Sequence, residues 1–200
     1  ELDSPNEAVF YTSGRTSNET AFLYQLFAKQ LGTNNLPDCS NMCHESSGSG
    51  LSQTVGLGKG SVTLEDLHKS DVIMVIGQNP GTNHPRMLAA LEKCKKNGGK
   101  IVQINPIPEA GTNAFIDPQS PLSILKGGTQ LTDLFLQVKI NGDIAILKAV
   151  MKILLDKEKE QPGKVFDQQF IEEYTEGYDA LISDLEKQNL DDLVAQTGVA

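Results

Sequence analysis

The sequence predicts an α/β fold: a three-layer, Rossmann-like domain with a mainly parallel sheet, followed by a C-terminal helical segment. Continuous apolar runs such as Val72–Ile76 are typical of parallel strands that are covered on both faces. Segments with helical spacing alternate with these runs, which is the order of βαβ units, and each run ends in polar turn residues. We expect the domain to cover residues 1–156, a solvated linker 157–164, and the helical segment 165–200.

The chain opens with the pattern of a strand, a glycine-containing loop and a helix. Ala8–Tyr11 is a short run of mostly strand-favouring residues, and it breaks at Ser13–Arg15. Thr16 and Glu19 have the spacing of a capping box at the start of the helix. Residues 34–60 are crowded with Gly and Ser and have no clean period, so we expect a long loop that is either functional or disordered.

A right-handed βαβ unit forms the centre of the predicted sheet. Its strands are Val72–Ile76 and Ile101–Ile104, and between them Asn83 can cap a helix whose first turn holds Pro85. Leu134–Ile140 alternates as a further strand, and the turn after it leads into an amphipathic helix.

The composition of the chain excludes several classes of function. Its 200 residues suit one ordinary domain or a domain with an appendage, and the net charge of −9 leaves no basic field for nucleic acid or an anionic membrane. The longest apolar runs reach only about five residues, against the roughly twenty that cross a bilayer. No signal peptide opens the sequence, and three cysteines indicate a reducing compartment, the cytoplasm. The absent initiator Met and the abrupt end favour an excised fragment.

Three predicted strand ends carry loops suited to a nucleotide, at Gly77–Asn83, Asn105–Glu109 and Lys139–Asp143. Ligands of open α/β sheets bind outside the carboxyl ends of the strands, near helix N-termini. Asn and Gln side chains offer donors and acceptors to a purine or a ribose, and Asp143 can accept from a guanine amino group. For any one loop, the simpler interpretation is a turn. No G-x-G-x-x-G pattern fits, and the nearest approach to a P-loop, 56–61, lacks the Ser or Thr that must follow its Lys.

Cys43 and His44 form the chemically richest pair in the sequence. A thiolate beside an imidazole can bind a soft metal or act as a nucleophile, whereas a lone Cys more often packs as a small hydrophobe. Cys39 lies four residues before Cys43, and without a second pair we expect no structural zinc. Cys94 lies on the apolar stripe of a predicted helix and is assigned to the core. Arg15 can meet a phosphate or a pterin, or form a surface ion pair.

Taken in order, these motifs resemble the molybdopterin oxidoreductases related to formate dehydrogenase alpha subunits. More narrowly, they resemble a formate-dehydrogenase-like branch that includes a protein linked to bacterial acid resistance. The resemblance extends through nearly the whole chain, and its specificity comes from the ordered series. The motifs that carry it are Tyr11–Glu19, Gly32–Cys39, Cys43-His44, Gly77–Pro85 and Thr175–Gly177.

The resemblance implies a cofactor of two molybdopterin guanine dinucleotides around one molybdenum or tungsten ion. Cys43 then stands at the position of the metal ligand, and His44 at that of the following histidine, which handles protons. The positions expected to bind the cofactor are Arg15, Asn35, Gly77, Gln78, Asn79, Asn83, Asn105, Pro106, Glu109, Lys139, Gly142 and Asp143. Expected partners are a small-molecule substrate, the remaining domains of a parent chain and an electron-transfer partner; an iron–sulfur cluster would lie outside this chain.

The sequence departs from formate dehydrogenases directly after the Cys-His pair, where they usually continue with Gly-Pro and this chain has Glu45 and Ser46. The departure adds a carboxylate beside the metal position and counts against formate as the substrate. An essential arginine, the iron–sulfur domain and the C-terminal pterin domain of such enzymes are absent from this sequence, so we expect the chain alone to be inactive. Two alternatives remain open: a Rossmann-like NAD(P) or nucleotide-binding module, and a non-catalytic docking domain.

Overall fold

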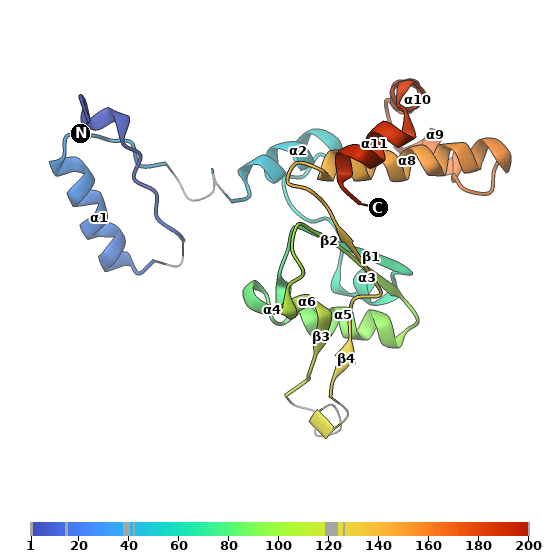
Figure 1. Cartoon of the computed structure of the whole chain (residues 1–200), viewed down its shortest axis with the longest axis horizontal. Helices are drawn as coiled ribbons and strands as arrows, with labels where there is room; N and C mark the ends of the chain where they lie inside the picture. Colours follow the sequence, from blue (N-terminus) through green and yellow to red (C-terminus); the bar gives the residue numbers. More distant parts are fainter. Residues whose placement is uncertain are drawn as a thin grey trace. The chain divides into compact units, whose positions relative to one another are not determined.

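The structure is a computed structural model that describes residues 2–14, 16–37, 41, 43–118, 124–125 and 127–199. It comprises two compact units, which we call the N-terminal unit (Glu1–Val62) and the sheet unit (Thr63–Ala200). Figure 1 shows the elements of each unit along the chain. None of the helices in the described ranges combines the length and the apolar character that crossing a membrane requires.

The described part of the N-terminal unit contains a short 3₁₀ helix and two α-helices, at Pro5–Glu7, Asn18–Gln30 (α1) and Glu45–Val55 (α2). Ser17 caps α1, because its Oγ accepts from the Thr20 N–H at 3.3 Å. The predicted capping pair of Thr16 with Glu19 is therefore wrong. Thr16 Oγ1 instead makes a hydrogen bond of 2.8 Å with Thr12 Oγ1.

Residues Ala8–Tyr11 do not form the predicted strand. The Phe10 N–H donates to the Asn35 carbonyl at 2.9 Å, but no strand in the described residues pairs with this segment. The Phe10 ring packs edge-on against Tyr24 and Phe27 of α1, with ring centroids 5.9 Å apart in each pair. Aromatic and β-branched residues favour strands mainly because their side chains pack well against neighbouring strands. Here helix α1 provides that packing surface for Phe10, so the ring packs without a partner strand.

The Gly- and Ser-rich stretch 34–60 is partly helical, which corrects the expectation of one long loop. Helix α2 begins directly after His44 and ends before Gly56, whose left-handed backbone (φ 73°) forms the C-cap. The helix buries none of its residues. A search for an apolar stripe could not find α2, because the helix has no buried face.

Three parallel strands form the main sheet in the described part of the sheet unit, in the order β1–β2–β5. Their bounds are Val72–Ile76 (β1), Lys100–Asn105 (β2) and Leu134–Gln137 (β5). Ile76 is level with Ile104, and Ile104 with Leu136, so the three strands end at the same height. A separate antiparallel ladder joins Ala114–Phe115 (β3) to Thr129–Gln130 (β4). The predicted parallel sheet is confirmed, although β5 is shorter than the predicted strand 134–140.

Helices cover both faces of the main sheet. On one face lie α3 (Leu64–Lys69) and α5 (Met87–Lys96). The buried cluster beneath them consists of Ile73, Val75, Leu88, Leu91, Cys94, Ile101 and Leu131. On the other face, Ile146 of α8 (Asp143–Glu160) packs with Ile104 and Val138. The three-layer α/β prediction is therefore confirmed, and Cys94, fully buried, belongs to the core as predicted.

Helix α8 continues to Glu160, so the predicted linker at 157–164 is helical in its first half. The turn that follows is held by Glu158, whose carboxylate accepts from the backbone N–H groups of Gly163, Val165 and Phe166 at 2.6 to 3.0 Å. These hydrogen bonds, of which the one from Gly163 has the largest effect, lower the pKa of the Glu158 carboxyl. The chain reversal after α8 is thus a fixed turn.

The chain after residue 165 is helical, as predicted. Its helices are α9 (Gln168–Tyr174), α10 (Tyr178–Lys187) and α11 (Leu190–Thr197). Leu193 of α11 packs against Ala145 and Ala149 of α8. Lys148 of α8 also pairs with Asp184 of α10 at 2.8 Å. The proposed domain boundary at residue 156 stays a prediction, and it falls within α8.

Candidate cofactor site at the carboxyl edge of the sheet

Hydrogen bonds tie the ends of the three main strands together. The Gly77 N–H donates to the Ile104 carbonyl at 2.9 Å, which joins the end of β1 to β2. Gln137 Nε2 donates to the Pro106 carbonyl at 2.9 Å, which joins the end of β5 to the loop after β2. The three loops that the sequence indicated therefore meet at one edge of the sheet.

The first loop starts with a glycine that its backbone conformation requires. Gly77 has φ 63°, and a Cβ at this position would find no atom within 4 Å. Two residues later, Asn79 Oδ1 accepts from the Thr82 N–H at 3.2 Å and caps the short helix α4 (Pro80–Asn83). The open space above Gly77 lets a ligand approach the backbone closely.

Asn83 does not cap the helix that follows, so this part of the prediction is wrong. It is the last residue of α4, and α5 begins at Met87 behind Arg86, which makes no side-chain cap. Instead, the dipeptide Asn79-Pro80 begins the short helix α4, which precedes α5, because Asn is a good N-cap and Pro fits the first turn of a helix.

The second loop is shaped by a buried asparagine at the end of β2. Asn105, only 6% exposed, donates through Nδ2 to the Ile107 carbonyl at 2.8 Å and lies 3.4 Å from Glu109 Oε2. Its amide is therefore engaged within the loop. Glu109 is half-buried and precedes the short helix α6 (Ala110–Asn113). Glu109 therefore places the carboxylate of this loop near the edge of the sheet.

The short helices α4 and α6 interlock through two glycines that the sequence reasoning missed. A Cβ on Gly81 would lie 2.3 Å from the Gly111 carbonyl oxygen, and a Cβ on Gly111 would lie 2.2 Å from Asn79 Oδ1. The two loops therefore fit together only because both residues lack side chains. A signal was present in the sequence: the tripeptide Gly-Thr-Asn occurs at 81–83 and again at 111–113.

A buried polar chain connects β2 to α6 beneath these loops. Thr132 Oγ1 donates to the Thr112 carbonyl at 2.8 Å and lies 3.5 Å from Gln103 Oε1. Gln103 is 1% exposed, and its Nε2 has no hydrogen-bond partner among the described residues. Burying a polar side chain in a central strand costs free energy unless its polar atoms are hydrogen-bonded. The pattern of apolar runs in the sequence did not reveal this buried residue.

The third loop combines a lysine, a strained turn and a carboxylate. Asn141 has φ 68°, and the Gly142 N–H donates to the Lys139 carbonyl at 2.8 Å, which closes the turn. Lys139 is exposed, and Asp143, half-buried, is the first residue of α8. The loop therefore presents one ammonium and one carboxylate at the edge.

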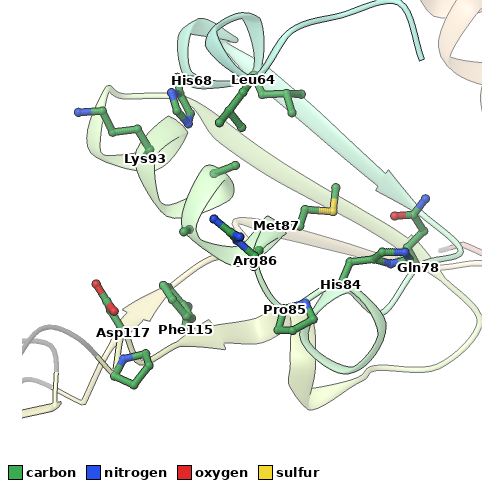
Figure 2. Close-up of a pocket in the computed structure, with 14 residues that line it drawn as sticks. Leu64, His68, Gln78, His84, Pro85, Arg86, Met87, Lys93, Phe115 and Asp117 are labelled. Atoms are coloured by element: carbon green, nitrogen blue, oxygen red, sulfur yellow. The ribbon is translucent and has the colours of Figure 1, made fainter. Parts of the chain in front are cut away.

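An open groove of about 1310 Å³ runs from the first loop along α5. Figure 2 shows Gln78 and His84 at one end and His68 and Lys93 at the other, with Phe115 on the wall formed by β3. Of the predicted cofactor residues in the described part of the chain, only Gln78 lines this groove.

Cys43 and His44 belong to the N-terminal unit, and both are exposed. The Cys43 thiol is free. Within the described residues, no group of three or more His, Cys, Asp or Glu side chains is arranged to hold a metal ion. A metal at Cys43 would thus need most of its ligands from elsewhere, which suits a cofactor that brings sulfur ligands of its own. Glu45, after His44, accepts a hydrogen bond from Asn41 Nδ2.

Three further residues that the sequence analysis singled out are Asn35, Arg15 and Cys39. Asn35 Nδ2 donates to the Asn6 carbonyl at 2.7 Å and to the Ala8 carbonyl at 3.2 Å, so its side chain organises its own unit. Arg15 and Cys39 lie outside the described residues.

The family model described as molybdopterin oxidoreductase matches residues 2–156. An uncharacterized oxidoreductase of Mycobacterium tuberculosis is 50% identical over 99% of this chain and 25% of its own length. Protein YdeP of Escherichia coli is 46% identical over 98% of this chain and 26% of its own. The alpha subunit of F420-dependent formate dehydrogenase 1 of Methanococcus maripaludis is 29% identical over 98% of this chain and 26% of its own.

Among solved structures, acetylene hydratase from Pelobacter acetylenicus resembles this chain with a TM-score of 0.59 and 17% identity, over 98% of this chain and 23% of that one. At this identity the likeness concerns the fold alone. The chain spans about a quarter of the length of the curated relatives that it matches.

Proposed function

Because the chain belongs to the molybdopterin oxidoreductase family, we propose that it is a cofactor-binding part of an enzyme that resembles formate dehydrogenase. In this proposal, the loops at the carboxyl edge hold a guanine dinucleotide of a bis(molybdopterin guanine dinucleotide) cofactor. Cys43 supplies the protein ligand to molybdenum or tungsten. The rest of the longer protein supplies the other half of the cofactor cradle, since the relatives are about four times as long.

The observation that carries this proposal is the interlocked edge itself. Hydrogen bonds tie the ends of the three strands together, and a Cβ on either Gly81 or Gly111 would force the first two loops apart. Loops that are already fixed lose little further freedom when a ligand binds. The open backbone at Gly77 and the exposed ammonium of Lys139 fit the close approach and the charge of a pyrophosphate.

Asp143 supports guanine as the base. A carboxylate accepts two hydrogen bonds side by side, and guanine offers two adjacent donors, its ring N–H and its amino group. Adenine offers an acceptor in place of the ring donor, so a carboxylate disfavours it. Asp143 is half-buried, and it is both the last residue of the third loop and the first residue of α8.

The chemistry at Cys43 follows from its exposure and its donor atom. A thiolate is a soft ligand that suits molybdenum or tungsten, and the bound metal would exchange electrons with a small-molecule substrate. His44 is exposed and follows Cys43 directly in the sequence, and imidazole is the side chain that most often serves in general acid–base catalysis. We assign His44 to proton transfer, with the substrate proton as its target.

The carboxylate of Glu45 argues for a substrate other than formate. It lies two residues from the proposed metal ligand, where it would repel a small anion. The proposal places the enzyme in the cytoplasm, with an electron-transfer partner that receives the electrons.

Analysis of the intact protein tests the proposal. Acid hydrolysis cleaves the pyrophosphate of a dinucleotide, so the purified protein should release GMP and should contain molybdenum or tungsten by mass spectrometry. Release of AMP, or of NAD(P) without metal, would contradict it and favour a Rossmann-like nucleotide module.

A further inference from the structure

The end of α11 lies against the loop that follows β5. The Lys139 N–H donates to the Thr197 carbonyl at 2.8 Å. Gly142 is so close that a Cβ on it would lie 3.0 Å from the same Thr197 oxygen. Val199 packs against the apolar cluster around Ile104. The end of α11 therefore contacts the third loop of the candidate site, although α11 lies more than 40 residues further along the sequence.

Gly198 lies directly under the side chain of Lys139. It ends α11 with a left-handed backbone (φ 74°), and a Cβ on it would lie 2.5 Å from Lys139 Cγ, 2.9 Å from Cδ and 2.8 Å from Cε. The aliphatic stem of the lysine thus rests along the glycine over three carbons. A lysine side chain loses rotamer entropy when it binds a ligand. Contact with Gly198 already restricts the rotamers of Lys139 before a ligand binds, so less entropy is lost on binding.

The ammonium of Lys139 is available for an anion. Among the described residues, no carboxylate pairs with Lys139 Nζ. Other lysines of the sheet unit do form ion pairs, at 2.7 to 3.2 Å: Lys69, Lys95, Lys96, Lys148, Lys152 and Lys159. In a chain with a net charge of −9, an unpaired ammonium at this edge of the sheet offers a phosphate group a charge-assisted hydrogen bond.

We propose that Gly198 is a positioning residue that directs Lys139 toward the phosphates of the guanine nucleotide. The inference rests on the proposed function, which it extends to the C-terminal helices. Gly198 touches no ligand itself. It acts by leaving room for the stem of Lys139, while the Thr197 carbonyl fixes the backbone of the lysine.

A matched pair of glycines separates this role from backbone strain. Gly163 has the same φ of 74°, and a Cβ on it would meet nothing within 4 Å. Gly163→Ala and Gly198→Ala therefore impose the same backbone strain, but only Gly198→Ala displaces Lys139. The probe is GDP, titrated against the cofactor-free intact protein, with thermal unfolding of each variant as the check of folding.

We expect Gly198→Ala to weaken GDP binding by about tenfold, the loss of one charge-assisted hydrogen bond, and Gly163→Ala to leave it unchanged. In a Lys139→Met background, Gly198→Ala should have no further effect, because its target is gone. Equal losses in the two glycine variants, or a full loss in the Lys139→Met background, would overturn the inference.

A readout without ligand separates this inference from the proposed function. Acetic anhydride labels exposed lysines, and mass spectrometry compares Lys139 with the other lysines of the same sample. Displacement of the stem should raise the labelling of Lys139 in Gly198→Ala and not in Gly163→Ala. If native protein fails to bind GDP while this contrast holds, the proposed function fails and the positioning contact stands. If labelling is the same in both variants, the positioning role is refuted.

Discussion

The carboxyl edge of the sheet and the segment that carries Cys43 are built in opposite ways. At the edge, Asn105 and Thr112 are buried and Gly81 and Gly111 interlock. In the Cys43 segment, the thiol is exposed and the helix that follows, α2, buries none of its residues. The edge is closely packed, whereas Cys43 and its described neighbours Asn41 and His44 are exposed.

Under the proposed function, this difference would assign nucleotide binding to the edge and metal ligation to the Cys43 segment. A preformed edge gains affinity because its loops are already ordered, and it can select a nucleotide by shape. A metal ligand at an exposed position can adapt to a cofactor that is held elsewhere. Substitutions at the edge should therefore change nucleotide binding, and substitutions near Cys43 should change chemistry with little effect on stability.

The largest effect on nucleotide binding is expected from breaking the glycine interlock. Gly81→Ala forces a methyl group against the Gly111 carbonyl, and overpacking of this kind costs about 1–3 kcal/mol. If the strain opens the loops, affinity of the cofactor-free intact protein for GDP should fall by ~10–100-fold in isothermal titration calorimetry.

Gly60→Ala is the control for this prediction, because a Cβ at Gly60 would meet nothing within 4 Å. It should bind GDP like the native protein. Native affinity in Gly81→Ala would show that the interlock does not support the site.

The same substitution at two cysteines compares the two regions directly. Cys94 is fully buried, its thiol donates to the Ser70 carbonyl at 3.2 Å, and burial raises the pKa of the thiol. Cys94→Ser should lower the free energy of unfolding by about 1–3 kcal/mol. Cys43→Ser should change it by less than about 0.5 kcal/mol, as an exposed position allows. Urea unfolding measures both, and equal losses would contradict the contrast.

Base selection at the edge should depend on Asp143. Asp143→Ala leaves the two adjacent donors of guanine without their acceptor, so the preference for GDP over ADP should shrink by about tenfold. Parallel titrations with the two nucleotides measure the ratio. Equal binding of GDP and ADP by the native protein would refute the assignment of Asp143.

The smallest effect on binding is expected from Asp133, which lies before β5 at the amino end of the sheet. Its carboxylate accepts from Lys95 Nζ at 2.7 Å and from the Ile101 N–H at 2.8 Å, and the hydrogen bond from Lys95 contributes most to lowering its pKa. Because the pKa of Asp133 is lower in the folded than in the unfolded protein, its charge stabilises the fold at pH values above the unfolded-state pKa, near 4. This stabilisation is lost as the pH falls through the folded-state pKa.

Asp133→Asn should therefore cost about 1–2 kcal/mol of unfolding free energy at pH 7 and clearly less at pH 3, with GDP affinity unchanged. Urea unfolding at the two pH values checks the difference. A loss of equal size at pH 3 would mean that the charge of Asp133 does not stabilise the fold.

The sequence was sufficient for the strands and insufficient for the contacts between loops. β1, β2 and the start of β5 follow from apolar runs and alternation, and the loops at their ends follow from polar turn residues. Helix α2 and the unpaired segment 8–11 were mispredicted, because neither periodicity nor propensity reveals whether a partner face exists.

The glycine contacts depend on distances between residues far apart in the chain. Gly81 meets Gly111, and Gly198 meets Lys139. Local patterns do not encode such contacts, although the repeated Gly-Thr-Asn was a usable sign for the first pair. The burial of Gln103 was hidden for a similar reason, because one polar residue among apolar neighbours resembles an ordinary exposed position.

X-ray absorption at the metal edge of the intact protein shows directly whether Cys43 ligates the metal. If the strand-end loops hold the cofactor and Cys43 ligates the metal, Cys43→Ser should retain the metal and the GMP but lose one metal–sulfur bond relative to the native protein. Turnover should be abolished in the same variant. An unchanged number of metal–sulfur bonds would show that Cys43 is not the ligand, and would contradict the account at its centre.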